Sequence, residues 1–264
     1  LPMLGICYGH QLLAHALGSN WSRERLAAYP EANVTAAKQR RFAALVGRRR
    51  RGEPVAYLRR HAEFYGLDLR VTPAVLIPRP ESETLVDAVL TAVLAGRTMT
   101  IADVGTGSGG LAIAVARQRP HWTVYATDRS AAALAVARAN ARRHHIRISF
   151  RCGDLLKPLA GIHLDVVVAN LPYLSDAVYR KQRRQLRFEP SLALRSGVDG
   201  LDHYRRLLTQ LAARTQRPQH VILEAEAGQV PTLRSLVDSN LPRAEFFHTV
   251  SNGVGVVVLT GPVG

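Results

Sequence analysis

From residue 98 onward the sequence alternates β-rich segments with longer helical ones. TMTIADV, WTVYATD, IRISFRC and LDVVVAN are the β-rich segments, and helical segments such as GGLAIAVARQR and SAAALAVARANARR separate them. Strands that are joined by helices run parallel, because each helix returns the chain to the same end of the sheet. The sequence therefore predicts an α/β fold with a mostly parallel sheet.

The last part of the chain departs from strict alternation. Helices are expected near 201–214 and 230–239, with the strand HVILEAE between them. The closing segments AEFFHTV and GVGVVVL are near enough in sequence to pair as a hairpin. We therefore expect an antiparallel hairpin to be added to the parallel sheet.

The region before the alternating pattern has a different organisation. Residues 10–51 carry only helix signals, including possible N-caps at Ser22 and Thr35 and a stop at Gly52. Two short strands are expected around Gly66. We divide the chain into a helical domain, a hairpin with a proline-rich connector, and an α/β domain, which cover residues 1–58, 59–80 and 81–264. The last of these should open with a helix from Glu81 to about residue 94.

The composition of the chain indicates the cellular environment in which it works. No apolar run approaches the roughly 20 residues that cross a bilayer, and residues 1–10 lack the basic start of a signal peptide. The two cysteines, Cys7 and Cys152, have no CxxC spacing, which argues against a disulfide framework and against a metal site. These features indicate a cytoplasmic protein without membrane contact.

The chain has a formal net charge of +15. Much of this charge lies in residues 48–51 and 181–187, with no aromatic side chains between the basic ones. Such runs form either a solvated basic face or a docking surface for an acidic partner. Direct binding of nucleic acid is therefore possible from charge, but charge does not identify a substrate.

A glycine-rich segment, Asp103-Val-Gly-Thr-Gly-Ser-Gly-Gly110, lies between an expected strand and an expected helix. At that place glycines let the backbone approach a nucleotide-like ligand. Asp128 ends the next strand, where its carboxylate could accept both ribose hydroxyls of an adenosine. NAD and S-adenosylmethionine both need such an acid, and the segment also satisfies GxGxxG, so either cofactor is compatible with it.

Two further residues favour S-adenosyl-L-methionine. Asp103 directly precedes the glycine turn and could lie near the cationic amino acid end of that cofactor. Leu155 follows the third strand and would cover an adenine ring.

Asn170-Leu171-Pro172-Tyr173 follows the fourth strand, at the edge where open α/β sheets bind ligands. An amide nitrogen is a poor nucleophile because its lone pair is delocalised. The Asn170 side-chain oxygen and the Leu171 carbonyl could each accept one N–H and so orient that lone pair. Pro172 stiffens the turn, and Tyr173 could pack on a planar amide. An adenine amino group would be held in the same way, so this motif predicts a planar NH2 acceptor more firmly than it predicts glutamine.

Several segments together resemble the PrmC/HemK family of release-factor glutamine N5-methyltransferases. They are GEPVAYL at 52–58, EFYG at 63–66, LIPRPESE at 76–83, the glycine segment, NLPY, EPSLAL at 189–194 and DGLD at 199–202. The resemblance implies a Rossmann-like class I methyltransferase sheet preceded by a small helical domain that docks the substrate. It also implies transfer of a methyl group from S-adenosyl-L-methionine to the glutamine of the Gly-Gly-Gln loop in a peptide-chain release factor, in translation termination.

The resemblance also implies roles for individual residues. The cofactor would contact Gly105, Thr106, Gly107, Ser108, Gly109, Asp128, Leu155 and Asn170, and the substrate glutamine would contact Asn170, Leu171, Pro172 and Tyr173.

The chain departs from the family pattern in two places. The family usually reads NPPY, so Leu171 replaces a proline, and we expect activity with a less rigid loop because the backbone carbonyl does the work. NLPY is also typical of ribosomal RNA adenine dimethyltransferases, which makes a nucleic-acid adenine methyltransferase the alternative. The segment LGICYGHQ at 4–11 is similar to the nucleophile elbow of glutamine amidotransferases around Cys7, but too little chain precedes it for that activity.

Overall fold

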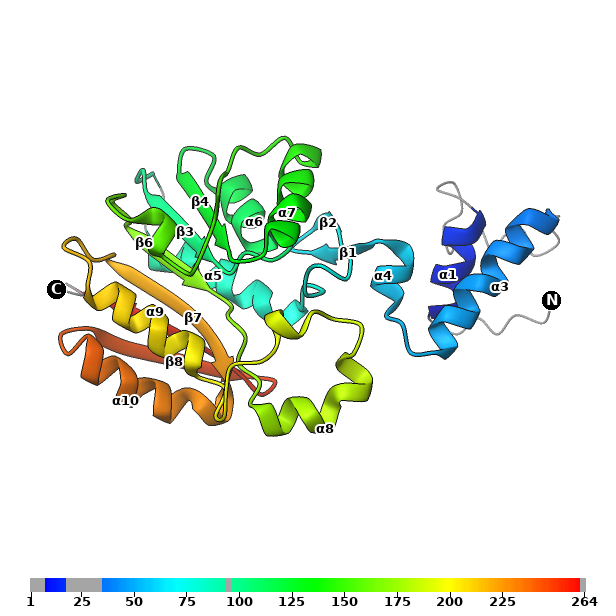
Figure 1. Cartoon of the computed structure of the whole chain (residues 1–264). Coiled ribbons are helices and arrows are strands. Elements are labelled where there is room, and N and C mark those ends of the chain that lie inside the picture. Colours follow the sequence, from blue (N-terminus) through cyan, green and yellow to red (C-terminus); the bar gives the residue numbers. More distant parts are fainter. Residues whose placement is uncertain (1–7, 18–34, 94–95, 262–264) are drawn as a thin grey trace. The chain divides into compact units, whose positions relative to one another are not determined.

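The computed structural model describes residues 8–17, 35–93 and 96–261 (Figure 1). It divides into two compact units, residues 1–61 and 62–264, and each is described by itself. Cys7 and the expected helix start at Ser22 lie outside the described residues. Within the described residues no helix is long and apolar enough to cross a membrane.

The first unit is helical, as expected. Its helices are α1 (Tyr8–Leu17), α3 (Ala36–Arg50) and α4 (Val55–Arg59). Thr35 caps α3, because its Oγ1 accepts from the Lys38 amide at 3.4 Å. Arginines fill the last turn of α3, where positive charge stabilises the carbonyl end of a helix. A small apolar core joins the three helices through Leu12, Ala16, Leu45, Val55 and Leu58.

The predicted hairpin around Gly66 is present. Its strands are β1 (His61–Phe64) and β2 (Leu67–Arg70). Asn140 anchors it, since the Asn140 side chain exchanges hydrogen bonds of 2.7 and 3.0 Å with the backbone of Arg70 and also donates to the Ser108 carbonyl at 2.8 Å. One buried amide therefore joins the hairpin to the glycine-rich segment.

The second unit is built on a seven-stranded sheet of order β5-β4-β3-β6-β7-β9-β8. Its strands are β3 (Thr100–Val104), β4 (Thr123–Asp128), β5 (Ser149–Cys152), β6 (Val166–Ala169), β7 (His220–Glu226), β8 (Glu245–Ser251) and β9 (Val254–Thr260). The strands β3 to β7 pair in parallel, whereas β9 pairs antiparallel with both β7 and β8. The expected fold class is confirmed, including the closing hairpin.

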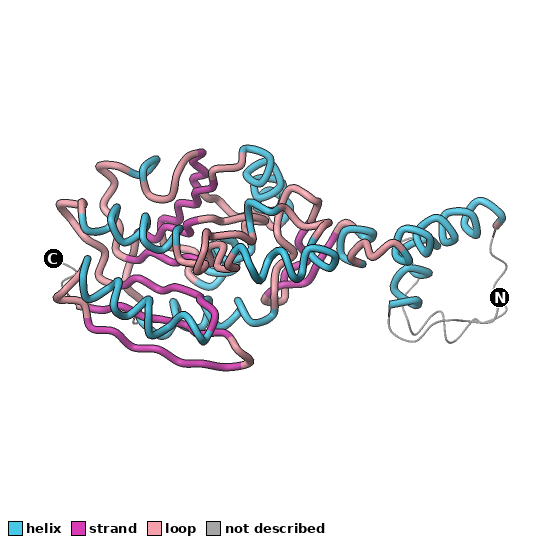
Figure 2. Tube along the Cα trace, turned by 60° about the horizontal axis from the view of Figure 1, so that its bottom comes forward, coloured by secondary structure: helices cyan, strands magenta, loops and turns pink. Residues whose placement is uncertain are grey.

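Helices cover both faces of this sheet (Figures 1 and 2). They are α5 (Glu83–Ala92), α6 (Gly110–Gln118), α7 (Ala131–Arg143), α9 (Asp202–Ala212) and α10 (Val230–Asn240). A further helix, α8 (Asp176–Leu186), lies away from the sheet (Figure 1). Successive side chains of a strand point to opposite faces, so Val167 joins one apolar core while Val166 and Val168 join the other. Burial on both faces explains the unbroken apolar run of β6.

One element differs from the expectations, and another was not predicted. The helix expected from Glu81 begins instead as a 3-10 turn, η1 (Pro80–Ser82), and α5 follows only at Glu83. The basic stretch at 181–187 belongs largely to α8, which has no buried residue. Ser175 caps α8, because its Oγ accepts from the Val178 amide at 3.3 Å. A serine at this place is a typical helix start, although it was not used to predict a helix here.

Candidate active site

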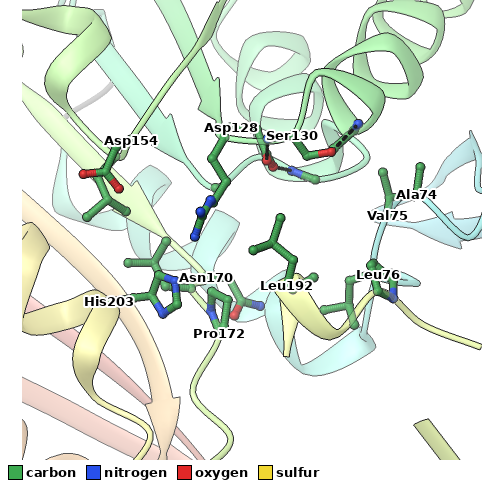
Figure 3. Close-up of a pocket in the computed structure, with 18 of the residues that line it drawn as sticks. Ala74, Val75, Leu76, Asp128, Ser130, Asp154, Asn170, Pro172, Leu192 and His203 are labelled. Carbon is green, nitrogen blue, oxygen red and sulfur yellow. Dashed lines mark hydrogen bonds between the residues drawn. The ribbon is translucent and has the colours of Figure 1, made fainter. Parts of the chain in front are cut away.

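A pocket opens at the carboxyl ends of the central strands, where the chain passes from strand to helix. Its lining comes from segments far apart in sequence: 74–76, 105, 107, 128–130, 133, 153–155, 170–172, 190, 192–193, 203 and 206. Figure 3 shows Asp128 and Ser130 on one wall and Asn170, Pro172 and His203 across from them. Its empty volume, which includes open solvent at the mouth, is about 770 Å³.

The glycine-rich segment makes a tight turn at the end of β3. Gly105 and Gly107 have φ angles of 78° and 55°, a region that side chains disfavour. The amides of Gly105 and Thr106 both donate to the Thr127 carbonyl at 2.9 Å, which joins the turn to β4. A Cβ at Gly105 would lie 2.9 Å from the Leu171 Cδ2 atom, so this glycine also makes room for the NLPY turn.

Asp128 is fixed at the end of β4 by two backbone amides. Ser130 donates to its Oδ1 at 2.8 Å, and Gly107 donates to its Oδ2 at 3.0 Å. Burial raises the pKa of this carboxyl, and these two hydrogen bonds oppose the rise without cancelling it. The carboxylate thus faces the pocket in a single orientation, as a recognition group for hydroxyls requires.

Asp103 lies beneath the turn and is 1% exposed. Its Oδ2 accepts from the Thr106 hydroxyl at 2.6 Å and from the Ala112 amide at 3.2 Å, so it holds the turn against α6. Its Oδ1 has no hydrogen-bond partner among the described residues. Burial raises the pKa of this carboxyl to about 7. A cationic group near Oδ1 would supply the missing partner.

Asn170 sits where β6 ends and the NLPY turn begins. Its side-chain Nδ2 donates to the Ser82 hydroxyl at 2.7 Å, which leaves the Asn170 side-chain oxygen available to a ligand. The Leu171 amide donates to the Tyr204 hydroxyl at 3.4 Å, and that hydroxyl donates to the Glu224 carbonyl. A proline at position 171 could not make this bond, because it has no N–H. The turn is therefore held by hydrogen bonding where the usual family sequence has a proline.

The other end of the NLPY turn is also fixed. The Gln229 side-chain nitrogen donates to the carbonyls of Tyr173 and Asp199, each at 2.9 Å. Gly200 lies against this contact, because a Cβ there would be 2.1 Å from the Tyr173 carbonyl oxygen. The Tyr173 ring is partly buried, and burial raises its pKa to about 12, with the Glu224 charge adding to the rise.

The pocket has a wall that the sequence did not predict. Glu189 is buried and accepts from the Ile77 amide at 3.2 Å and from the Arg79 guanidinium at 2.5 Å. This contact joins the segment 74–76 to the segment 190–193, and both line the pocket. The LIPRPESE and EPSLAL segments, already distinctive in sequence, were the available signal for it.

Two side chains of α9, His203 and Arg206, complete the lining, and no sequence signal marked them. His203 faces the pocket in Figure 3, while its Nδ1 pairs with the Ser196 hydroxyl at 2.6 Å. Burial lowers the pKa of His203, and nearby Arg206 and Arg129 lower it further. This imidazole therefore favours its neutral form, which suits contact with an uncharged ring.

The structure brings together most of the residues that the sequence singled out. Those that line the pocket are Gly105, Gly107, Asp128, Leu155, Asn170, Leu171 and Pro172. The remaining predicted residues, Asp103, Thr106, Ser108, Gly109 and Tyr173, do not line the pocket. Thr106 and Ser108 are buried, and Gly109, at φ 84°, is the N-cap of α6.

A mostly parallel sheet with a glycine turn after β3, an acid at the end of β4 and NLPY after β6 defines a class I methyltransferase. Residues 81–188 match the family model of the methyltransferase small domain, and residues 9–59 match that of the PrmC N-terminal domain.

Curated relatives identify the family within that class. The release factor glutamine methyltransferase of Coxiella burnetii is 39% identical over 83% of this chain and 79% of its own. Its counterpart in Moorella thermoacetica is 43% identical over 81% of this chain and 77% of its own. The chain belongs to the release factor glutamine methyltransferase family.

Solved structures support the fold alone. A ribosomal protein methylase from Lactobacillus delbrueckii aligns with a TM-score of 0.54 at 21% identity, covering 73% of this chain and 84% of that one. A 16S rRNA methyltransferase of T. thermophilus, solved with AdoMet and guanosine, aligns with a TM-score of 0.57 at 16% identity, covering 76% of this chain and 49% of that one.

Proposed function

We propose that the chain transfers a methyl group from S-adenosyl-L-methionine to the side-chain amide nitrogen of the glutamine in the Gly-Gly-Gln loop of a peptide-chain release factor. The observation that carries this proposal is the Asn170 side chain, which is held at the pocket by Ser82 with its oxygen left for a ligand. Membership of the release factor glutamine methyltransferase family supports the choice of substrate.

The pocket residues fit the cofactor. Asp128 offers a fixed carboxylate for the ribose hydroxyls, and Leu155 offers an apolar side chain for adenine. The glycine turn leaves the space that side chains would fill. When bound, the cofactor supplies a methyl group that a positively charged sulfur already activates.

The protein then acts by orientation. The Asn170 side-chain oxygen and the Leu171 carbonyl each accept one N–H of the substrate amide, which directs the nitrogen lone pair toward the cofactor side of the pocket. Groups that are fixed before the reaction cost no reorganisation during it. Pro172 lines the pocket beside them, and the backbone contact of Tyr173 with Gln229 keeps the turn in place.

Loss of the ribose acceptor should weaken cofactor binding. Because a hydrogen bond to a charged group contributes roughly 1.5 to 3 kcal/mol, we expect Asp128→Ala to raise the Kd for S-adenosylmethionine about 10- to 100-fold. Calorimetry measures this directly. Asp238→Ala removes an equal charge from α10 and should leave the Kd unchanged. An unchanged Kd in a folded Asp128→Ala protein would show that Asp128 does not bind the cofactor.

The substrate is tested by radiolabelled methyl transfer to several acceptors side by side. Label should appear on intact release factor and disappear when alanine replaces its loop glutamine. A short peptide carrying Gly-Gly-Gln should react poorly, because binding energy away from the reacting amide positions it. Strong labelling of ribosomal RNA or duplex DNA with an inert release factor would instead favour the adenine methyltransferase.

A further inference from the structure

A buried carboxylate behind Asn170 has no part in the mechanism above. Glu224, in β7, is 1% exposed, and its Oε2 has no hydrogen-bond partner among the described residues. Burial raises its pKa, while hydrogen-bonding interactions with Ser82, Asn170 and Tyr173 oppose that rise without cancelling it. An incompletely paired carboxylate in the protein interior costs folding free energy, so its presence calls for a functional reason.

Ser82 interacts with both Asn170 and Glu224. It accepts from the Asn170 Nδ2 at 2.7 Å, and its interaction with the Glu224 carboxylate lowers the pKa of that group. A hydroxyl carries one proton and two lone pairs, whereas an ionised carboxylate can only accept. The Ser82 proton is therefore directed to Glu224, and the Ser82 oxygen is left to accept from Asn170.

This direction of donation decides which way the Asn170 amide faces. Its NH2 group points to Ser82, so its oxygen is the atom left for the substrate. We propose that Glu224, acting through Ser82, is a positioning residue that fixes the Asn170 side-chain oxygen toward the NH2 group to be methylated. The proposal rests on the role of Asn170 in the proposed function. It adds the two residues, Ser82 and Glu224, that set the orientation of the Asn170 amide.

A side chain at position 224 that can donate a hydrogen bond would reverse the orientation of the Asn170 amide. A glutamine, or a protonated Glu224, can give a proton to Ser82, whose own proton then turns toward Asn170. The Asn170 amide would rotate to accept it, and its NH2 group would face the substrate NH2 group. Two donors cannot hydrogen-bond to each other, so the substrate nitrogen would lose one of its two orienting acceptors.

Kinetics separate positioning from binding. Removing one oriented contact costs about 100- to 1000-fold in turnover, and for a group acting through a neighbour we expect roughly 10- to 100-fold. Glu224→Gln and Ser82→Ala should each lower kcat by that factor, with KM for the release factor and Kd for the cofactor within about 3-fold of wild type. Glu245→Gln, the same change on the exposed strand β8, should leave kcat unchanged.

A spectroscopic readout keeps the test independent of substrate. The side-chain NH2 resonances of Asn170, identified by their absence in Asn170→Ala, should shift in Glu224→Gln without any ligand. In wild type they should move as falling pH protonates Glu224, and in Glu224→Gln that movement should be absent. The titratable groups that affect Glu224 are Glu81, Tyr173 and Tyr204. Both tyrosines have raised pKa values, and the movement should persist in Glu81→Gln.

The outcomes distinguish the two proposals. An inert release factor with a shifted Asn170 resonance in Glu224→Gln would reject the proposed substrate and keep the positioning role. A Glu224→Gln protein with native kcat and an unshifted Asn170 resonance would overturn the positioning role. A lower melting temperature with native kcat in the folded fraction would overturn it as well, because Glu224 would then be structural only.

Discussion

Asn170→Ala should lower the turnover number by about 100- to 1000-fold, the cost of losing one preorganised acceptor that acts mainly in the transition state. The Asn170 oxygen is left available because Ser82 takes its NH2 group, so the alanine variant loses that oxygen without disturbing the glycine turn. Single-turnover methyl transfer to release factor, with cofactor saturating, measures the chemical step.

The same variant has an internal control. Asp128 and Gly107 remain in place in Asn170→Ala, so the Kd for S-adenosylmethionine should change far less than the turnover number. Near-normal turnover by a folded Asn170→Ala protein would mean that the NLPY turn does not orient the acceptor.

Gly200→Ala should disturb both stability and activity. A Cβ at this position would lie 2.1 Å from the Tyr173 carbonyl oxygen and 2.3 Å from the Gln229 side-chain nitrogen, and the φ of 83° disfavours any side chain. Overpacking and a left-handed backbone together should lower the free energy of unfolding by about 2 to 4 kcal/mol. Thermal or urea unfolding measures this loss.

Activity in Gly200→Ala should fall at least about 10-fold, because the backbone that must move carries Tyr173 and the end of the NLPY turn. Gly228→Ala is the matched control, since a Cβ there would meet no atom within 4 Å. Equal stability of the two alanine variants would show that the turn tolerates displacement.

The features that depend on neighbours along the chain could be predicted from the sequence. The alternation of β-rich and helical segments predicts the parallel sheet, and the order of strand, turn and helix predicts that Gly105, Gly107 and Asp128 line the pocket, as they do. The sequence suggested a place for the Asp103 side chain near the cofactor, but it did not predict the contacts of that side chain with the protein. Asp103 lies one residue before the end of β3, and its carboxylate turns beneath the glycine segment toward Thr106 and Ala112.

The rest of the site depends on tertiary contacts that local patterns do not encode. Ser82 and Asn170 are 88 positions apart, and Arg79 and Glu189 are 110 apart. Ser82 was expected inside an ordinary helix, but it is the buried last residue of a 3-10 turn, and its hydroxyl accepts from the Asn170 side chain. Glu224 looked like one more residue of a strand, because only the folded sheet places it behind the NLPY turn.

The scattered origin of the pocket lining has a thermodynamic consequence. Segments from 74 to 206 each supply part of the wall, and the Arg79–Glu189 ion pair joins two groups of loops that are far apart in sequence. A ligand that binds only the assembled pocket stabilises the native state by about 2.7 kcal/mol when its concentration is about 100 times its Kd. This stabilisation applies to the whole α/β unit, because unfolding separates the segments of the wall and so destroys the pocket. Occupancy of the pocket is therefore linked to global unfolding, and a cell that supplies the ligand also protects the fold.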